Sequence, residues 1–353
     1  MKRPIRPSPR ATRHSALLLG ALALGPLVGC GGDGSAAGSG SDTTGETTSA
    51  DGATQVADLR VNHIQVVGTH NSYHIAPKVG SKEWMYTHKT LDVQAAEQGV
   101  RNFELDVHWN PDTASFDVHH INVLDDNTTC ATFKGCLQTL RAFSDAHPNH
   151  VPLWVWIESK DSVEVMAKDG MVDKLGAEID AVWPADRRIS PDDVRAGEVD
   201  PKTGLQKHGW PQLDAMRGRA MFTLLDHGAI RDTYIAEDPT LKGKVIFAEG
   251  TADDPWGVVA KFDDPQGGAA EMDAAVRKGL LVRTRADAGD DGPKKNFARR
   301  DAALASGAHA CATDYPREVP EAPGYEVRLP DGLRARCNPV TAPPGCVDAL
   351  VEP

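Results

Sequence analysis

Two carboxylates and a histidine alternate with apolar residues in the segment FELDVH, residues 103–108. Side chains alternate between the two faces of a strand, so Glu104, Asp106 and His108 would share one face. Neighbouring carboxylates repel each other and are unfavourable to bury unless a cation or hydrogen-bond donors lie between them. The segment therefore predicts a site for a hard metal ion. The alternative is the exposed face of an edge strand.

Three other apolar runs also end in polar side chains that can carry protons or bind a cation. VVGTHNSYH, residues 66–74, leads to His70 and Asn71; FDVHH ends at His119 and His120; LWVWIESK ends at Glu158 and Lys160. Each run alone is as typical of a polar turn, a surface ion pair or a structural histidine. Because barrel active sites lie at the carboxyl ends of the strands, four strands that end in this way predict one shared site.

Short apolar runs alternate with helical patterns from residue 60 onward, which is typical of an α/β fold. The predicted strands are 64–68, 102–108, 115–119, 153–158, 220–225, 244–248, 280–284 and 308–313. Eight such strands predict a single TIM-type (β/α)8 barrel over residues 58–316. The barrel should be irregular between its second and third strands, because residues 110–114 are too few for a helical crossover.

Helical spacing of apolar residues predicts helices over 89–99, 137–147 and 162–182. The segment 186–212 is rich in proline, glycine and charge, and is predicted to be a long loop. Residues 317–353 hold seven prolines and two cysteines without a clear periodic pattern. They predict a C-terminal extension that wraps the barrel rather than a second domain. Gly68 is interpreted as a close turn after the first strand.

Residues 1–29 have the layout of a secretory signal, because five basic residues precede an apolar run, 16–28, too short to span a bilayer. The run ends in Leu27-Val28-Gly29-Cys30, which resembles the lipobox of bacterial lipoproteins. This resemblance implies a lipid on Cys30 that anchors the chain to a cell-envelope membrane. The alternative is an ordinary secretory signal with an incidental cysteine. Residues 30–57 are small and polar, and they predict a flexible linker.

The chain of 353 residues is acidic, and loss of residues 1–29 would move its net charge from −12 to −17. This charge argues against a nucleic-acid partner, and we expect a monomer. Five cysteines follow Cys30. Export permits disulfides, and close spacing favours the pairs Cys130/Cys136 and Cys337/Cys346, although spacing alone does not fix connectivity. Cys311 would remain a buried thiol.

The ordered set of polar residues resembles phosphoinositide-specific phospholipase C, above all its secreted, calcium-dependent bacterial and fungal branch. The set is His70-Asn71, Glu104-x-Asp106, His119 and Glu158. The resemblance covers about residues 60–316, and VRTRAD and ATDYP look like the seventh and eighth strand ends of that branch. It implies a phosphoinositide substrate, cleaved when the inositol 2-hydroxyl attacks the phosphorus to give a cyclic phosphate and diacylglycerol.

Carried over residue by residue, the resemblance implies Ca²⁺ ligands at Asn71, Glu104, Asp106 and Glu158, which all offer oxygen. It implies His119 as general acid, His70 as donor to the phosphoryl oxygen, and Glu104 or His70 as the base. The predicted substrate contacts are Lys160, Arg283, Arg285 and Tyr315, with Tyr315 stacked on the sugar ring and Asp314 orienting a neighbour. Barrel-end salt bridges and a packed tyrosine are the alternative for this last group. Ser72, Tyr73 and His74 receive no role.

Two other functions compete with this prediction. Glycerophosphodiester phosphodiesterases resemble the chain in barrel, Glu-x-Asp pair and histidine pair, but that family has His-Arg where this chain has His70-Asn71. A lipid-anchored inositol-phosphate binder without catalysis would need the charges but not both histidines.

Overall fold

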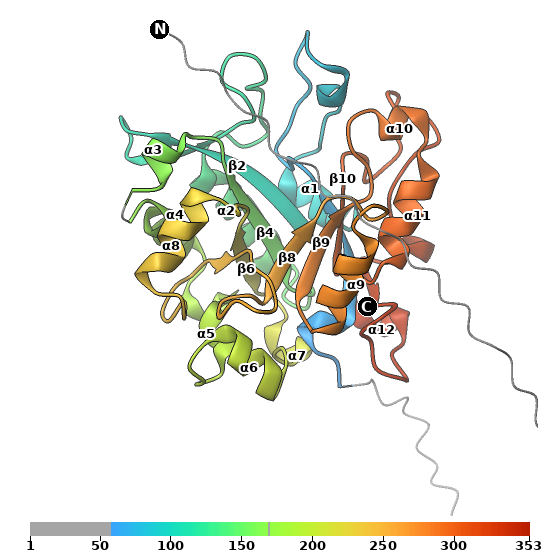
Figure 1. Ribbon diagram of the computed structural model, residues 1–353. Helices are drawn as coiled ribbons and strands as arrows, with labels where there is room; N and C mark the ends of the chain where they lie inside the picture. The colour runs from blue at the N-terminus through green and yellow to red at the C-terminus, as the bar shows by residue number, and fades with distance from the viewer. Residues whose placement is uncertain (1–57, 169) are drawn as a thin grey trace, which may run out of the picture. The chain divides into compact units, whose positions relative to one another are not determined.

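Eight parallel strands form the centre of the computed structural model, which describes residues 58–168 and 170–353 (Figure 1). They are β1 (Ile64–Thr69), β2 (Asn102–Asn110), β4 (Leu153–Ser159), β6 (Ala220–Leu224), β7 (Phe247–Ala248), β8 (Val259–Phe262), β9 (Leu281–Arg285) and β10 (Ala310–Thr313). Parallel pairing runs without a break from β8 through β9, β10, β1, β2, β4 and β6 to β7. A single parallel bridge between Glu249 and Val259 joins the end of β7 to β8. The predicted TIM-type barrel is confirmed.

Three further strands lie outside the barrel. β3 (Ser115–Val118) forms an antiparallel hairpin with β2, and β11 (Ala335–Cys337) pairs antiparallel with β1. β5 (Arg188–Ile189) pairs with the first half of β6, whose second half pairs with β7. The prediction of 115–119 as a barrel strand is therefore wrong, and β8 takes that place. The irregularity predicted between the second and third strands is this hairpin.

The helices lie around the barrel (Figure 1). They are α1 (Leu91–Ala96), α2 (Phe133–Ala146), α3 (Val163–Met166), α4 (Met171–Val182), α5 (Pro191–Arg195), α6 (Pro201–His208), α7 (Leu213–Met216), α8 (Ala229–Glu237), α9 (Ala269–Arg277), α10 (Asp291–Lys294), α11 (Phe297–Ala305) and α12 (Asp348–Val351). Single 3-10 turns are η1 (Val61–His63), η2 (Lys82–Trp84), η3 (Ala185–Arg187) and η4 (Pro330–Gly332). None of the described helices has the length and apolar character needed to cross a membrane.

Two predicted boundaries were wrong for identifiable reasons. The segment 162–182 is two helices, and Gly170 has a left-handed φ of 77° directly before the second one. The segment 186–212 is no long loop, because it holds β5, α5 and α6. Both helices start with a proline in their first turn, where the missing N–H needs no partner, and the Asp200 side chain caps α6 through the N–H of Thr203. Prolines that start helices were interpreted as loop residues.

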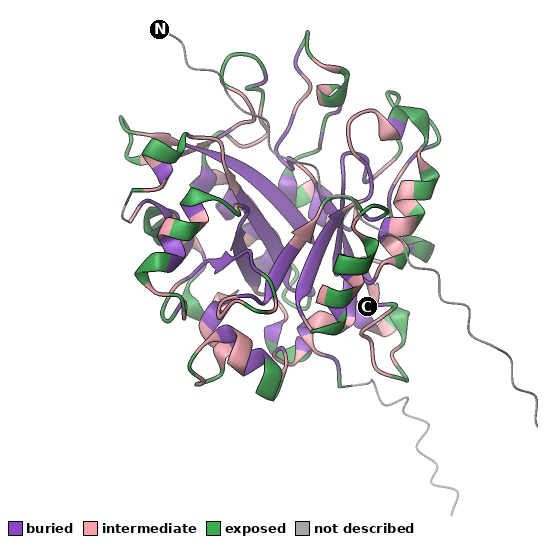
Figure 2. Ribbon diagram, in the orientation of Figure 1, coloured by how far each residue is buried: buried purple, intermediate pink, exposed green. Residues whose placement is uncertain are grey.

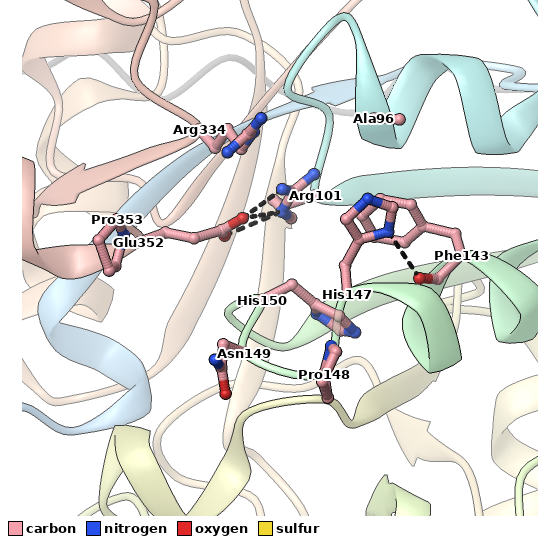
Figure 3. Close-up of a pocket in the computed structure, with 10 residues that line it drawn as sticks. All are labelled: Ala96, Arg101, Phe143, His147, Pro148, Asn149, His150, Arg334, Glu352 and Pro353. Atoms are coloured by element: carbon pink, nitrogen blue, oxygen red, sulfur yellow. Dashed lines mark hydrogen bonds and ion pairs between the residues drawn. The ribbon is translucent and has the colours of Figure 1, made fainter.

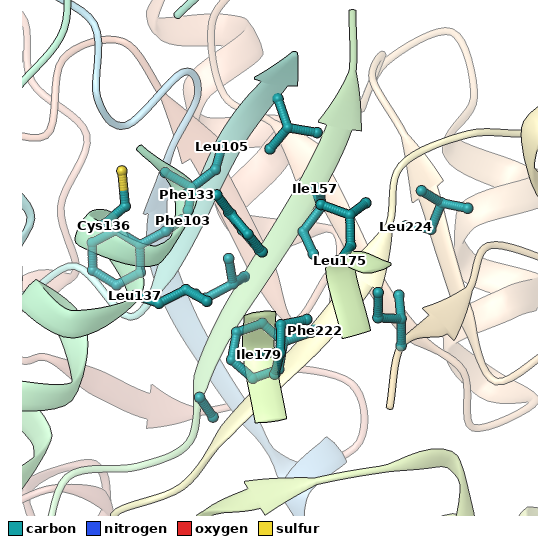
Figure 4. Close-up of a cluster of buried hydrophobic side chains, with 14 of the residues drawn as sticks. Phe103, Leu105, Phe133, Cys136, Leu137, Ile157, Leu175, Ile179, Phe222 and Leu224 are labelled. Carbon is teal, nitrogen blue, oxygen red and sulfur yellow. The ribbon is translucent and has the colours of Figure 1, made fainter. Parts of the chain in front are cut away.

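The pleat of β2 separates the core from the polar site. Phe103 and Leu105 point outward to α2 and α4, where they meet Leu137 and Ile179 (Figure 4). Glu104 and Asp106 therefore point into the barrel. The barrel interior is filled by Trp154, Trp156, Met221, Phe247, Val259 and Leu281. Figure 2 shows the resulting burial of the strands on both faces.

Gly68 lies inside β1 rather than in the predicted turn after it. A Cβ atom at this position would lie against the Asn102 side chain of β2. The glycine therefore allows β1 and β2 to approach, which sets the distance between their carboxyl ends.

The C-terminal residues close the amino end of the barrel. Arg101, directly before β2, is 1% exposed and its Nε donates to Glu352 Oε2 at 2.9 Å (Figure 3). Burial opposes ionisation of Glu352, but Arg101 outweighs it and lowers the pKa of Glu352 below the ordinary 4.5.

The pairs Cys130–Cys136 and Cys337–Cys346 are disulfides and Cys311 is a buried thiol, so these predictions are confirmed. The predicted signal (1–29) and linker (30–57) lie outside the described residues.

We expect Glu352→Gln to lower the free energy of unfolding by about 3–5 kcal/mol, because Arg101 would remain buried without a counter-charge. Glu352 has a lowered pKa in the folded state, so its contribution should be lost as the pH falls below 4.5. Urea unfolding at neutral pH and at pH near 4 measures both effects. Glu326→Gln is the control, because its partner Arg328 is 53% exposed and the loss should stay below about 1 kcal/mol. Equal losses in the two variants would contradict the role of the buried pair.

Candidate functional site

The carboxyl ends of neighbouring barrel strands bring most of the predicted site residues together. In the parallel pair of β2 and β4, Asp106 lies opposite Glu158. His70 directly follows β1 and Asp314 directly follows β10, which pair with each other. The adjacent β9 contributes two arginines. These side chains are at the end of the barrel where active sites of this architecture lie.

Three carboxylates form the centre of the site. Glu104, Asp106 and Glu158 each offer an oxygen, and these atoms all lie within 4.8 Å of one another. Lys160 Nζ is 3.0 Å from Asp106 Oδ2 and 2.9 Å from Glu158 Oε1, and Arg283 forms an ion pair with Glu104. Three carboxylates with two basic partners leave an excess of negative charge when all are ionised.

Burial has opposite consequences for the two members of the central ion pair. Asp106 is fully buried, and this raises its pKa well above the ordinary 3.8, although Lys160 opposes the shift. Burial alone would lower the pKa of Lys160, but the carboxylates of Asp106 and Glu158 outweigh it and raise that pKa. Lys160 therefore stays charged, and Asp106 is the acid that most needs a further cation.

His70 is held by a carboxylate on one side and faces another on the other side. Its Nδ1 lies 2.8 Å from Asp314 Oδ1, and its Nε2 lies 3.9 Å from Glu104 Oε1. Burial, assisted by the Arg285 guanidinium, lowers the pKa of His70 well below the ordinary 6.5, although Glu104 opposes this. The ring is therefore neutral at pH 7. It donates Nδ1–H to Asp314, so Nε2 is free to accept a proton.

Asn71 lies next to the carboxylates in an unusual backbone conformation. Its φ of 42° is in the left-handed region, which asparagine tolerates better than most residues. The residue is 1% exposed, and its Oδ1 accepts no hydrogen bond from the described residues. A buried oxygen without a donor is unfavourable unless something else coordinates it.

These oxygens fit a hard divalent cation. The Asp106 carboxylate oxygens, like Asn71 Oδ1, accept no hydrogen bond of good geometry from the described part of the chain. A cation of the calcium type takes six to eight oxygen ligands, and carboxylate and amide oxygens are the usual ones. Lys160 bridges Asp106 and Glu158, so its ammonium group would have to move aside or share their oxygens with the ion.

His119 lies across the hairpin from the carboxylates. The last registered pair of β2 and β3 is Val107 with Val118, so continuing the register by one residue places His119 opposite Asp106. Its ring stacks on His108 at a centroid distance of 3.8 Å, and its Nε2 is 2.6 Å from Asn122 Oδ1. His119 therefore borders the site, with its Nε2 held by a neighbouring loop.

A pocket lined by His70, Asn71 and Asp314 opens at this end of the barrel. The residues predicted to contact the substrate differ in their access to it. Arg285 lines the pocket and its Nη2 lies 3.3 Å from Asp314 Oδ2. Arg283 is 1% exposed beneath the site, where it pairs with Glu104 instead of facing solvent. Tyr315 is 2% exposed and packs against Tyr325, so its ring faces are covered by protein. The predicted stacking of Tyr315 on a sugar ring is therefore not supported.

Other pocket residues were missed because they lie in the connection between β1 and α1, where the sequence has no clear strand or helix period. The pocket that holds His70 and Asn71 is also lined by Trp84 and Tyr86. The Tyr86 hydroxyl lies 3.3 Å from His70 Nδ1. Ser72, to which no role was assigned, accepts the backbone N–H of Glu104 through its Oγ at 2.8 Å. The only sequence signal for this side of the pocket is that Trp84 and Tyr86 follow closely after His70 and Asn71 in the chain.

The family model for "Phosphoinositide phospholipase C, Ca2+-dependent" matches residues 59–117 and 108–339 of the chain. No curated protein matches the chain significantly by sequence. The solved apo structure of a calcium-dependent phosphoinositol-specific phospholipase C from Pseudomonas sp. is 17% identical, with a TM-score of 0.56 over 79% of this chain and 96% of that chain. A Ca²⁺-dependent phosphatidylinositol-specific phospholipase C from Streptomyces antibioticus is 20% identical, with a TM-score of 0.54 over 73% and 95%. At these identities, the two structures show a common fold.

We expect Lys160→Met to make folding stability depend more strongly on pH. Without the ammonium group the pKa of Asp106 should rise further, and an acid with a raised folded-state pKa stabilises the fold only while it is protonated. Thermal unfolding should therefore show a loss of about 3 kcal/mol between about pH 5 and pH 8 beyond that of the wild type. Added Ca²⁺ should restore stability at the higher pH. The exposed Lys242→Met is the control, and a pH dependence equal to the wild type in Lys160→Met would overturn this account.

Proposed function

The chain belongs to the calcium-dependent phosphoinositide phospholipase C family, a group of phosphodiester-cleaving enzymes, and we propose that it cleaves phosphatidylinositol-type lipids. The products would be diacylglycerol and a cyclic inositol phosphate. The observation that carries the proposal is the His70 ring, whose Nδ1 is held by Asp314, beside a cluster of three carboxylates of which two are buried. A plain binder of inositol phosphates would need the positive charges but not this oriented base.

Four oxygen-bearing residues are proposed as the Ca²⁺ ligands: Asn71, Glu104, Asp106 and Glu158. Their orphan and clustered oxygens support this assignment. When bound there, the ion would lower the pKa of the inositol 2-hydroxyl and offset the negative charge of the phosphorane.

His70 is a better candidate than Glu104 for the base. Its lowered pKa keeps Nε2 unprotonated at pH 7, whereas the Glu104 carboxylate is already occupied by its ion pair with Arg283. The same protonation state argues against the earlier expectation that His70 donates to the phosphoryl oxygen. That role passes to Arg285, which lines the pocket, and to Lys160, which lies at the carboxylate cluster.

The reaction would proceed in line at the phosphorus. The 2-hydroxyl oxygen forms a bond to phosphorus as His70 Nε2 takes its proton, and the bond from phosphorus to the diacylglycerol oxygen breaks. His119 would give a proton to the departing alkoxide. Its Nε2 lies 2.6 Å from the Asn122 side-chain amide oxygen, so this nitrogen carries a hydrogen, and the imidazolium form of the ring would transfer it and be left as neutral imidazole.

Export with a lipid on Cys30 is also proposed, which would hold the enzyme at a membrane surface. The lipobox-like sequence before Cys30 and the two disulfides, which are typical of oxidising compartments, support it.

The substrate is tested by incubating the purified protein with phosphatidylinositol vesicles or with glycerophosphoinositol, with Ca²⁺ or with chelator. Cyclic inositol phosphate formed from phosphatidylinositol only with Ca²⁺ supports the proposal. Free glycerol 3-phosphate from the second substrate would identify a glycerophosphodiester phosphodiesterase instead. Absence of turnover with either substrate would favour a binder.

Substitution of the two histidines tests the proposed mechanism. His70→Ala and His119→Ala should each lower kcat by about 10²–10⁴-fold, because each removes one proton carrier. His208→Ala is the matched control, since this histidine is 49% exposed on α6 and should leave kcat unchanged. Full activity in either of the first two variants would refute its assigned role.

Two substitutions at Asn71 distinguish the role of its side-chain oxygen as a proposed metal ligand from the role of its backbone conformation. Asn71→Asp keeps a side-chain oxygen, and Asn71→Gly suits the left-handed φ of 42° but removes that oxygen. We expect the Ca²⁺ concentration for half-maximal activity to rise about tenfold or more in Asn71→Gly, equivalent to roughly 1.4 kcal/mol, and to change little in Asn71→Asp. Calorimetric titration with Ca²⁺ gives the same comparison without substrate. An unchanged Ca²⁺ requirement in Asn71→Gly would remove Asn71 from the ligand set.

A further inference from the structure

A second group of metal-ligating side chains lies beside the pocket: His74, His120 and Asp125. Each offers one ligand atom, and these atoms all lie within 4.8 Å of one another. His74 follows β1, whereas His120 and Asp125 lie on the loop after β3. The side chains of His74 and Asp125 are fully buried, and that of His120 is 16% exposed. The mechanism proposed above uses none of the three.

The hydrogen bonds of His74 leave a lone pair facing a carboxylate. Its Nδ1 lies 3.0 Å from the carbonyl oxygen of Tyr86, which can only accept, so Nδ1 carries a hydrogen. In the neutral ring Nε2 then carries none, yet it lies 2.9 Å from both oxygens of Asp125. Two lone-pair-bearing groups at this distance need a cation between them, either a second ring proton or a metal ion.

The position of His120 favours a metal ion over a second ring proton. Its Nδ1 lies 2.7 Å from Asp125 Oδ2, so two imidazole nitrogens converge on one carboxylate. One proton on His74 would already give Asp125 its counter-charge, whereas a metal ion would use all three groups as ligands. The bond from His74 Nδ1 to a backbone carbonyl is also the second contact that metal-binding histidines usually make.

We propose that His74, His120 and Asp125 bind a divalent transition-metal ion of the zinc type, separate from the three-carboxylate site. Imidazole nitrogen suits such ions, whereas calcium prefers oxygen ligands throughout. Metal–ligand distances of about 2.0–2.2 Å in a tetrahedral site place the ligand atoms roughly 3.3–3.6 Å apart. The partly exposed His120 therefore moves outward by about half an ångström on binding.

The ion would connect two loops that matter for the pocket. His74 is four residues after His70, and His120 directly follows His119. His120 also lines the pocket, so a water molecule can complete the coordination from that side. The three ligands thus hold the backbone segments that carry both candidate proton carriers, whatever the substrate is.

The test uses the full chain, stripped with chelator, dialysed and titrated with Zn²⁺ or with Co²⁺ as a spectroscopic probe. We expect about one equivalent of tightly held ion per chain, visible Co²⁺ absorption typical of nitrogen coordination, and a rise in Tm on Zn²⁺ addition. His120→Ala should lose all three effects. Asp106→Asn should retain them, because it alters only the carboxylate site.

His208→Ala is the matched control and should bind the ion as the wild type does. If His120→Ala is poorly folded, Asp125→Asn with circular dichroism as a folding check gives the same comparison, since the amide keeps the shape of the side chain. A wild-type chain that holds no stoichiometric Zn²⁺, or a His120→Ala variant that holds as much as the wild type, would overturn the proposal. In that outcome the cluster is a hydrogen-bonded ion pair only.

Discussion

The convergence of three carboxylates, two of them buried, at one end of a barrel is the constraint on which the site depends. Ionised acids in a low-dielectric interior are unfavourable unless cations or hydrogen-bond donors compensate them. Lys160 and Arg283 supply two positive charges, and Ser72 fixes the backbone of Glu104. Burial, reinforced by the neighbouring carboxylates of Glu158 and Glu104, raises the pKa of Asp106 despite Lys160, so a further cation here would favour its ionised form. The same carboxylate oxygens that lower the stability of the metal-free fold are the ones that could bind a cation.

The pleat and register of the barrel strands position these carboxylates. Because side chains alternate along β2, the residues that pack against α2 and α4 also force Glu104 and Asp106 inward. The parallel register of β2 and β4 then sets Glu158 opposite Asp106. The acids are thus positioned by strands, while His70 and His119 lie just past strand ends.

The sequence revealed the parts of the site that follow a regular period, and it failed where no period exists. The alternation in FELDVH and the polar ends of β1 and β4 placed Glu104, Asp106, His70 and Glu158 correctly at one end of a barrel. β8 was missed because its four residues include a lysine and lack an apolar run. Tyr86 and Trp84 come from the connection between β1 and α1, which holds only the short turn η2, and its path is set by long-range contacts that no local pattern records. Tyr315 was misplaced because sequence gives the type of a side chain but not the direction in which it faces.

The pairing of His70 with Asp314 shows how the closure of the barrel contributes to chemistry. These residues are 244 positions apart, yet the parallel register of β1 and β10 brings them into hydrogen-bond contact at 2.8 Å. The carboxylate fixes which ring nitrogen carries the hydrogen, and burial keeps the ring neutral. Neither effect exists before the first and last barrel strands pair. The contact that orients His70, the proposed base, therefore depends on the pairing of β1 with β10 in the closed barrel, whereas the carboxylate cluster is positioned by β2 and β4.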